Sequence, residues 1–137
     1  MYSYIKENRG KVLLAPLVTY WIILFIGTSI PSDHLSLVVD IGDKLKHLLA
    51  YLILGFLLSL NLHFQQKWEH LSANAFIYAF VICLFYGAVD ELHQLIVPNR
   101  SAEFLDWLAD AFGSIIGVLS AMFLLRKIKS DKYQTET

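Results

Sequence analysis

Four stretches of the chain are apolar enough and long enough to cross a lipid bilayer as helices. They cover residues 12–30, 44–62, 73–97 and 102–125. An α-helix rises about 1.5 Å per residue, so roughly 20 residues cross a hydrocarbon core about 30 Å thick. The pattern therefore predicts an all-α protein with a single membrane domain over residues 1–137, built as a bundle of four transmembrane helices.

The first stretch, residues 12–30, carries no charged side chain on any helix face. The helices of a soluble bundle carry charges on their outward faces, so this stretch argues against a soluble protein. Lys6, Arg9 and Lys11 precede it, as basic residues also precede the core of a signal peptide. Because the apolar stretch is longer than a usual signal core and no clear cleavage site follows, we expect an uncleaved span. A membrane helix also tolerates Pro16.

The overall composition agrees with a membrane protein and excludes several functions. Hydrophobic residues make up 56% and charged residues 17% of the 137 residues, whereas an ordinary soluble domain has roughly 25% charged residues. With 11 basic and 12 acidic residues, the chain lacks the basic excess that is typical of nucleic-acid binding. A single cysteine forms neither an internal disulfide nor a Cys-based zinc site.

The distribution of lysine and arginine predicts the orientation of the bundle. Four spans place both termini on one side of the membrane. The basic residues on that side are Lys6, Arg9, Lys11, Lys67, Arg126, Lys127, Lys129 and Lys132, and those on the other side are Lys44, Lys46 and Arg100. The positive-inside rule then predicts a multi-pass protein of the cell inner (cytoplasmic) membrane with both termini in the cytoplasm.

Local signals predict how the later helices begin, end and pack. Residues 98–100 form a tight turn, so the third and fourth helices are expected to be antiparallel neighbours. Ser101 is the predicted N-cap of the fourth helix, and Asp40 that of the second. The polar tail from Ser130 is expected to be frayed. Two glycines spaced by four residues in the fourth helix, Gly113 and Gly117, predict a close contact between helices.

Ionisable residues near membrane spans are costly and are often functional. Here they gather at the extracytoplasmic ends of the second, third and fourth predicted helices. Asp43, His47 and Tyr51 follow one another at intervals of four residues and therefore lie on one helix face. The corresponding ends of the other two helices contribute Asp90, Glu91, Gln94, Asp106 and Asp110. We expect these side chains to meet in one polar pocket at the outer surface of the membrane.

The same residues form three motifs that resemble the VanZ-like family of membrane proteins. The motifs are Asp43-Lys44-x-x-His47-x-x-x-Tyr51, Asp90-Glu91-x-x-Gln94-x-x-x-Pro98-x-Arg100 and Asp106-x-x-x-Asp110-x-x-Gly113-x-x-x-Gly117. They extend over residues 43–117, and the first span also suits the four-span layout of that family. The chain departs from the family pattern at Asp110, where an Asn is more common. The extra carboxylate changes the charge of the predicted pocket.

The resemblance implies a setting in the bacterial cell envelope, and it does not supply a reaction. The family is named for a protein linked to low-level resistance to teicoplanin, a glycopeptide that acts on lipid-linked cell-wall precursors. The expected partner is therefore a membrane lipid or a lipid-linked cell-wall intermediate, and a link to glycopeptide resistance is part of that expectation.

A first hypothesis is that the pocket recognises, or hydrolyses, an anionic amphiphile. Lys44, His47 and Arg100 would hold a phosphate or carboxylate. The candidate catalytic residues are His47, Glu91 and Asp106, with His47 or Glu91 as general acid or base. The candidate substrate-binding residues are Asp43, Lys44, Tyr51, Asp90, Gln94, Arg100 and Asp110.

Two other hypotheses remain open. The acidic residues with His47 and His93 include enough oxygen and nitrogen ligands for a divalent ion. Their spacing contains no established zinc motif, however, and no residue is assigned as a metal ligand. Alternatively, the polar groups order the bundle without catalysis, or bind a lipid or partner protein. The pairs expected in that case are Asp43–Lys44, Arg100–Glu103 and Arg100–Asp106. The sequence thus leaves open whether the protein is an enzyme, and it names no cofactor.

Overall fold

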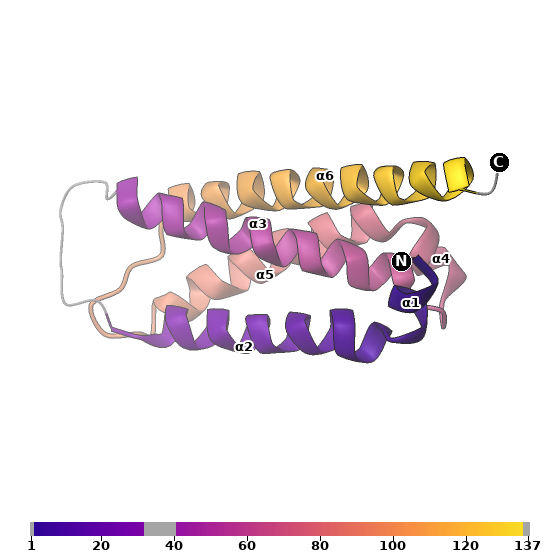
Figure 1. Ribbon diagram of the computed structural model, residues 1–137. Coiled ribbons are helices and arrows are strands. Elements are labelled where there is room, and N and C mark those ends of the chain that lie inside the picture. Colours follow the sequence, from indigo (N-terminus) through magenta and orange to yellow (C-terminus); the bar gives the residue numbers. More distant parts are fainter. Residues whose placement is uncertain (1, 32–40, 136–137) are drawn as a thin grey trace.

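The computed structural model describes residues 2–31 and 41–135, and every regular element among them is a helix (Figure 1). In chain order these are α1 (Tyr2–Glu7), the π-helical turn η1 (Gly10–Leu14), α2 (Ala15–Ser29), α3 (Ile41–Phe64), α4 (Glu69–Ala73), α5 (Ala75–Gln94) and α6 (Phe104–Thr135). The segments long and apolar enough to cross a membrane are Gly10–Ser29, Gly42–Phe64, Ala75–Gln94 and Phe104–Ser130. The all-α fold with four such helices is confirmed.

Three details of the predicted elements differ from the structure. The third span ends at Gln94 rather than at residue 97. The predicted cap at Ser101 is wrong, because α6 begins at Phe104 and its first backbone hydrogen bonds are accepted by the carbonyl of Glu103. The polar tail from Ser130, expected to be frayed, is assigned to α6 as far as Thr135, since no glycine or proline follows Gly117 to end the helix. Asp40 lies outside the described residues.

The first span begins with an irregular turn next to Pro16. Proline has no backbone N–H, so it cannot donate to the carbonyl four residues before it. The backbone widens into the π-helical turn η1, where the Ala15 N–H donates to the Gly10 carbonyl. The buried Asn61 side chain of α3 donates to the Leu13 carbonyl at 2.8 Å and holds this turn against the bundle. The span therefore accommodates Pro16 at its beginning.

Helices α3 and α6 lie side by side along their length and form the most extensive contact in the structure (Figure 1). A Cβ atom added to Gly113 would lie 2.1 Å from the carbonyl oxygen of Leu48, and one added to Gly117 would lie 2.1 Å from that of Leu52. No side chain fits at such a distance, so the two backbones touch because both α6 residues are glycine. The predicted close contact is confirmed, and its partner is α3.

The connection between α5 and α6 is the tight turn that the sequence predicts. The Arg100 N–H donates to the Val97 carbonyl at 3.2 Å, and Asn99 has a positive φ of 60°. Proline suits the second position of such a turn, and asparagine tolerates positive φ at the third. As a result α5 and α6 run antiparallel, and the end of α5 faces the start of α6 (Figure 1).

The described N- and C-terminal residues lie at one end of the bundle, and the start of α3, the end of α5 and the start of α6 lie at the other (Figure 1). Large apolar side chains cover the outside of the spans. Examples are Ile26, Phe85 and Phe123, which are 55%, 72% and 72% exposed. Soluble monomers rarely expose such surfaces. An apolar outer face of this kind suits contact with the hydrocarbon chains of lipids. Together with the four spans, it indicates a multi-pass membrane protein.

Candidate functional site

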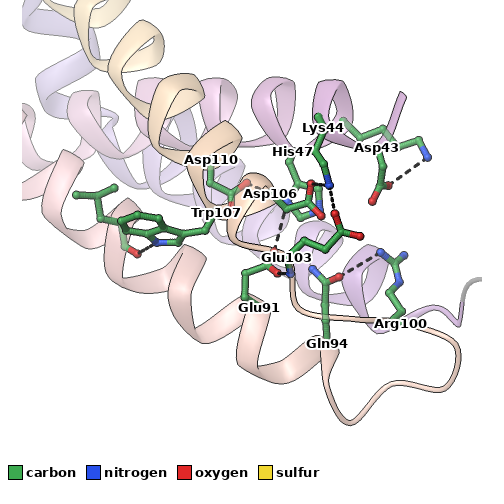
Figure 2. A network of polar contacts seen from close by, with 12 residues as sticks. Asp43, Lys44, His47, Glu91, Gln94, Arg100, Glu103, Asp106, Trp107 and Asp110 are labelled. Atoms are coloured by element: carbon green, nitrogen blue, oxygen red, sulfur yellow. Dashed lines mark hydrogen bonds and ion pairs between the residues drawn. The ribbon is translucent and has the colours of Figure 1, made fainter. Parts of the chain in front are cut away.

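The start of α3, the end of α5 and the start of α6 carry the predicted site residues at the end of the bundle that is remote from the termini, which we call the polar end. Figure 2 shows most of these side chains. Helix α3 contributes its first turns, α5 its last turns, α6 its first turns, and residues 98–100 connect the latter two. The residues are Asp43, Lys44, His47 and Tyr51 on α3, Asp90, Glu91 and Gln94 on α5, Arg100 in the turn, and Asp106 and Asp110 on α6. Segments distant in sequence are thus brought to one place.

Lys44 joins α3 to α6 through two carboxylates. Its Nζ atom lies 2.5 Å from Glu103 Oε2 and 2.5 Å from Asp106 Oδ1, and Asp106 is only 2% exposed (Figure 2). The predicted Asp43–Lys44 pair is wrong, because adjacent helix residues point in different directions whereas residues three apart face each other. Asp43 instead lies 3.5 Å from Lys46. The charge of Lys44 is therefore already balanced within the protein.

Besides Lys44 and its two partners, a second cluster is formed by His47, Glu91 and Asp110, and we call it the buried triad. His47 Nδ1 lies 3.0 Å from Asp110 Oδ1 and 4.0 Å from Glu91 Oε1. All three residues are buried, and each comes from a different helix. The second carboxylate oxygen of Glu91 accepts a hydrogen bond from the Glu103 N–H at 2.7 Å. Glu91 thereby supplies an acceptor at the beginning of α6, where backbone donors have no partner within the helix.

Arg100 faces α2 rather than the acidic residues of α6. Its Nε atom donates to the Ile30 carbonyl at 3.1 Å, and its terminal nitrogens lie 3.5 Å from the Gly27 carbonyl and from Gln94 Oε1 (Figure 2). The last carbonyls of a helix have no partner within it and accept bonds readily. The predicted pairs of Arg100 with Glu103 and Asp106 are therefore wrong. Within residues 2–31 and 41–135, Arg100 has no carboxylate within ion-pair distance.

A cavity of about 300 Å³ lies between α2, α3 and α5 at the polar end. Its lining combines charged and apolar side chains. It is formed by Tyr20, Ile23, Leu24, Gly27, Thr28, Asp43, Lys46, His47, Ala50, Tyr51, Asp90 and Arg100. Asp90 is 2% exposed, and its Oδ2 atom has no hydrogen-bond partner among the described residues. The cavity thus combines a buried carboxylate, an arginine and an apolar wall around one ligand-sized space.

The cavity divides the predicted site residues into two sets. Asp43, His47, Tyr51, Asp90 and Arg100 line it. The remaining ones, Lys44, Glu91, Gln94, Asp106 and Asp110, do not line it. Glu91 and Asp110 contact the lining residue His47, and Gln94 contacts the lining residue Arg100. His47 belongs to both the cavity and the buried triad, so it connects the two sets.

The sequence analysis missed the contribution of the first span to the site. Tyr20, Gly27 and Thr28 of α2 line the cavity, and the Tyr20 hydroxyl donates to the Ala50 carbonyl at 2.8 Å. A signal was present, because Tyr20, Leu24 and Thr28 are spaced by four residues and share one helix face. Glu103 was also missed as a partner of Lys44, because the predicted pair placed it beside Arg100.

Comparison with known families finds a match over most of the chain. The family model described as VanZ/LLP1 matches residues 3–126, which include the first span and the three motifs at the polar end. Neither the curated proteins nor the solved structures contain a match to this chain.

Proposed function

The chain belongs to the VanZ/LLP1 family, and from this premise we propose that it binds the headgroup of an anionic membrane amphiphile in the cavity between α2, α3 and α5. The observation that carries this proposal is the position of Arg100. Its guanidinium borders a cavity whose other wall includes the apolar side chains of Ile23, Leu24 and Ala50. A ligand with an anionic head and an apolar tail matches both walls.

The lining suggests how such a headgroup is recognised. A guanidinium binds phosphate or carboxylate as a planar fork, and Lys46 adds a second positive charge at the cavity. The Asp90 carboxylate, which also lines the cavity, would accept a hydrogen bond from a hydroxyl or ammonium group of the same headgroup. The apolar tail leaves the cavity past Ile23, which is 59% exposed on the outer face of α2.

Anionic phospholipids and lipid-linked cell-wall intermediates share this headgroup chemistry. The proposed link to teicoplanin resistance rests on the second source, because that glycopeptide acts on lipid-linked precursors. In a catalytic version of the proposal, His47 is the group that moves a proton at the cavity, and Glu91 and Asp106 support it. His47 alone among these three lines the cavity.

A second, non-catalytic role is favoured by the contacts of Lys44. Its ion pairs with Glu103 and Asp106 span two helices, and the Asp106 side chain is buried. Networks of this kind specify how membrane helices pack. We assign the ordering of the bundle to Lys44 and its partners, and ligand binding to the residues that line the cavity.

Replacing Arg100 with glutamine is expected to weaken binding of an anionic amphiphile at least tenfold, since a charge-assisted hydrogen bond contributes about 1.5–3 kcal/mol. Native mass spectrometry of the purified full-length protein would compare phosphatidylglycerol, undecaprenyl phosphate and zwitterionic phosphatidylcholine. Arg126→Gln is the matched control, because it removes the same charge from an exposed position near the other end of the bundle. Equal losses in the two variants, or no preference for anionic headgroups, would contradict the proposal.

The orientation proposed for the polar end predicts the labelling of single cysteines. In a Cys83→Ala background, Ser101→Cys at the polar end should react with a membrane-impermeant maleimide on intact cells. Gln66→Cys at the opposite end should react only after lysis, and both positions are exposed. The reverse pattern would place the polar end in the cytoplasm and overturn the orientation derived from the basic residues.

A further inference from the structure

The buried triad of His47, Glu91 and Asp110 has the donor set of a metal site. One imidazole and two carboxylates converge from α3, α5 and α6, and one ligand atom of each lies within 4.8 Å of the others. We propose that the triad binds a divalent transition-metal ion of the zinc class. This inference does not depend on the headgroup proposal, because Glu91 and Asp110 do not line the cavity.

The distances within the triad are close to those of a loaded site. Zinc ligands lie about 2.0–2.2 Å from the metal, so tetrahedral neighbours are about 3.4 Å apart. The His47 Nδ1 atom lies 3.0 Å from Asp110 Oδ1 and 4.0 Å from Glu91 Oε1, which brackets that separation. Small movements of the side chains would admit the ion. Metal binding would replace the proton that His47 and Asp110 otherwise share.

The buried oxygens of the triad supply a second, independent reason. Asp110 is 1% exposed and Glu91 is 7% exposed. Their Oδ2 and Oε1 atoms have no hydrogen-bond partner among the residues that the structure describes. Buried acceptors without partners are costly, and two ionised carboxylates beside a single histidine would leave an excess of negative charge in the buried cluster. A divalent cation would coordinate carboxylate oxygens and balance the negative charge of the two carboxylates.

The surroundings hold the triad in place. The Glu103 N–H donates to Glu91 Oε2 at 2.7 Å, which orients the carboxylate so that Oε1 faces His47. Supporting hydrogen bonds of this kind fix metal ligands. Gly87 leaves room beside the triad, because a Cβ atom there would lie 3.0 Å from Asp110 Oδ2. The triad is thus oriented on one side by a backbone hydrogen bond and packed against a glycine on the other.

A neighbouring group of ligands, Asp43, His47 and Asp106, also lies within 4.8 Å. Its carboxylates are already engaged, since Lys44 lies 2.5 Å from Asp106 and Lys46 lies 3.5 Å from Asp43. Among the described residues, the buried triad is therefore the group whose carboxylates are not paired with a lysine. Nitrogen with two oxygens suits zinc, and three protein ligands leave one position of a tetrahedron for water or another ligand.

The test uses the purified full-length protein, stripped with a chelator and dialysed against zinc chloride. We expect about one zinc ion per chain by elemental analysis, and visible absorption from bound cobalt(II) when cobalt chloride replaces zinc. Glu91→Gln and Asp110→Asn should each lower the affinity for zinc at least tenfold. Asp43→Asn is the matched control, because it removes a carboxylate from the neighbouring group only, and it should retain zinc.

The change in melting temperature caused by zinc distinguishes a loss of zinc binding from a loss of folding in each variant. Zinc should raise the melting temperature of the wild-type protein and of Asp43→Asn, since a ligand stabilises the state that binds it. Zinc should raise the melting temperature of folded Glu91→Gln less than that of the wild-type protein at the same zinc concentration. Absence of stoichiometric zinc in the wild-type protein would overturn the proposal. So would zinc binding that is lost in Asp43→Asn and retained in Glu91→Gln.

Discussion

Replacing Lys44 with methionine is expected to lower the free energy of unfolding by about 3–5 kcal/mol, the usual cost of removing one partner from a buried ion pair. Asp106 is 2% exposed and lies 2.5 Å from the ammonium group. Without Lys44 its carboxylate would remain buried with no opposite charge beside it. Chemical unfolding of the purified protein in detergent, followed by circular dichroism, measures the change.

The matched control for this prediction is Lys46→Met, two residues further along α3. The Lys46 side chain is 75% exposed and lies 3.5 Å from Asp43. Surface ion pairs contribute about 0–1 kcal/mol, so Lys46→Met should have little effect. Adding Asp106→Asn to Lys44→Met should recover part of the lost stability, because the uncompensated charge is then gone. Equal effects of the two lysine substitutions would refute the role assigned to Lys44.

Replacing Gly113 with alanine should separate α3 from α6 and lower the free energy of unfolding by about 1–3 kcal/mol. The new Cβ atom would lie 2.1 Å from the Leu48 carbonyl oxygen, and the nearest atom is backbone that cannot rotate away. Leu48 follows His47 directly, so the same displacement should also move His47 away from Asp110. Unfolding in detergent measures the loss of stability.

Gly10→Ala is the control for the glycine contact, because no atom lies within 4 Å of the position of its added Cβ. Alanine favours a helix over glycine by about 1 kcal/mol, so this substitution should be neutral or slightly stabilising. If Gly113→Ala were tolerated as well as Gly10→Ala, the helices would not pack as closely as the structure indicates.

Those features that depend on local periodicity could be predicted from the sequence. The four spans follow from the length of the apolar stretches, and the α3–α6 contact was signalled by Gly113 and Gly117. The residues of the polar end were identified because Asp43, His47 and Tyr51 share a helix face and the turn at 98–100 folds α6 back beside α5.

The partners of the long side chains could not be predicted in this way. Spacing along a helix says which residues share a face, but it does not say which neighbouring helix that face meets. Lys44 therefore forms ion pairs with Glu103 and Asp106 rather than the predicted pair with Asp43. Arg100 instead donates to the carbonyls of Gly27 and Ile30 at the C-terminal end of α2, because the direction of the turn depends on how the helices pack. The role of α2 in the cavity was hidden for the same reason.

The proposed binding of an anionic headgroup beside Arg100 is tested most directly by photo-crosslinking from α2 in membranes. A photoreactive amino acid would replace Ile23, which lines the cavity, or Ile26, which does not, and the two are similarly exposed at 59% and 55%. We predict that position 23 captures an anionic amphiphile and that Arg100→Gln abolishes this capture, whereas position 26 captures bulk lipid in both backgrounds. The same lipids at both positions, unaffected by Arg100→Gln, would contradict the account.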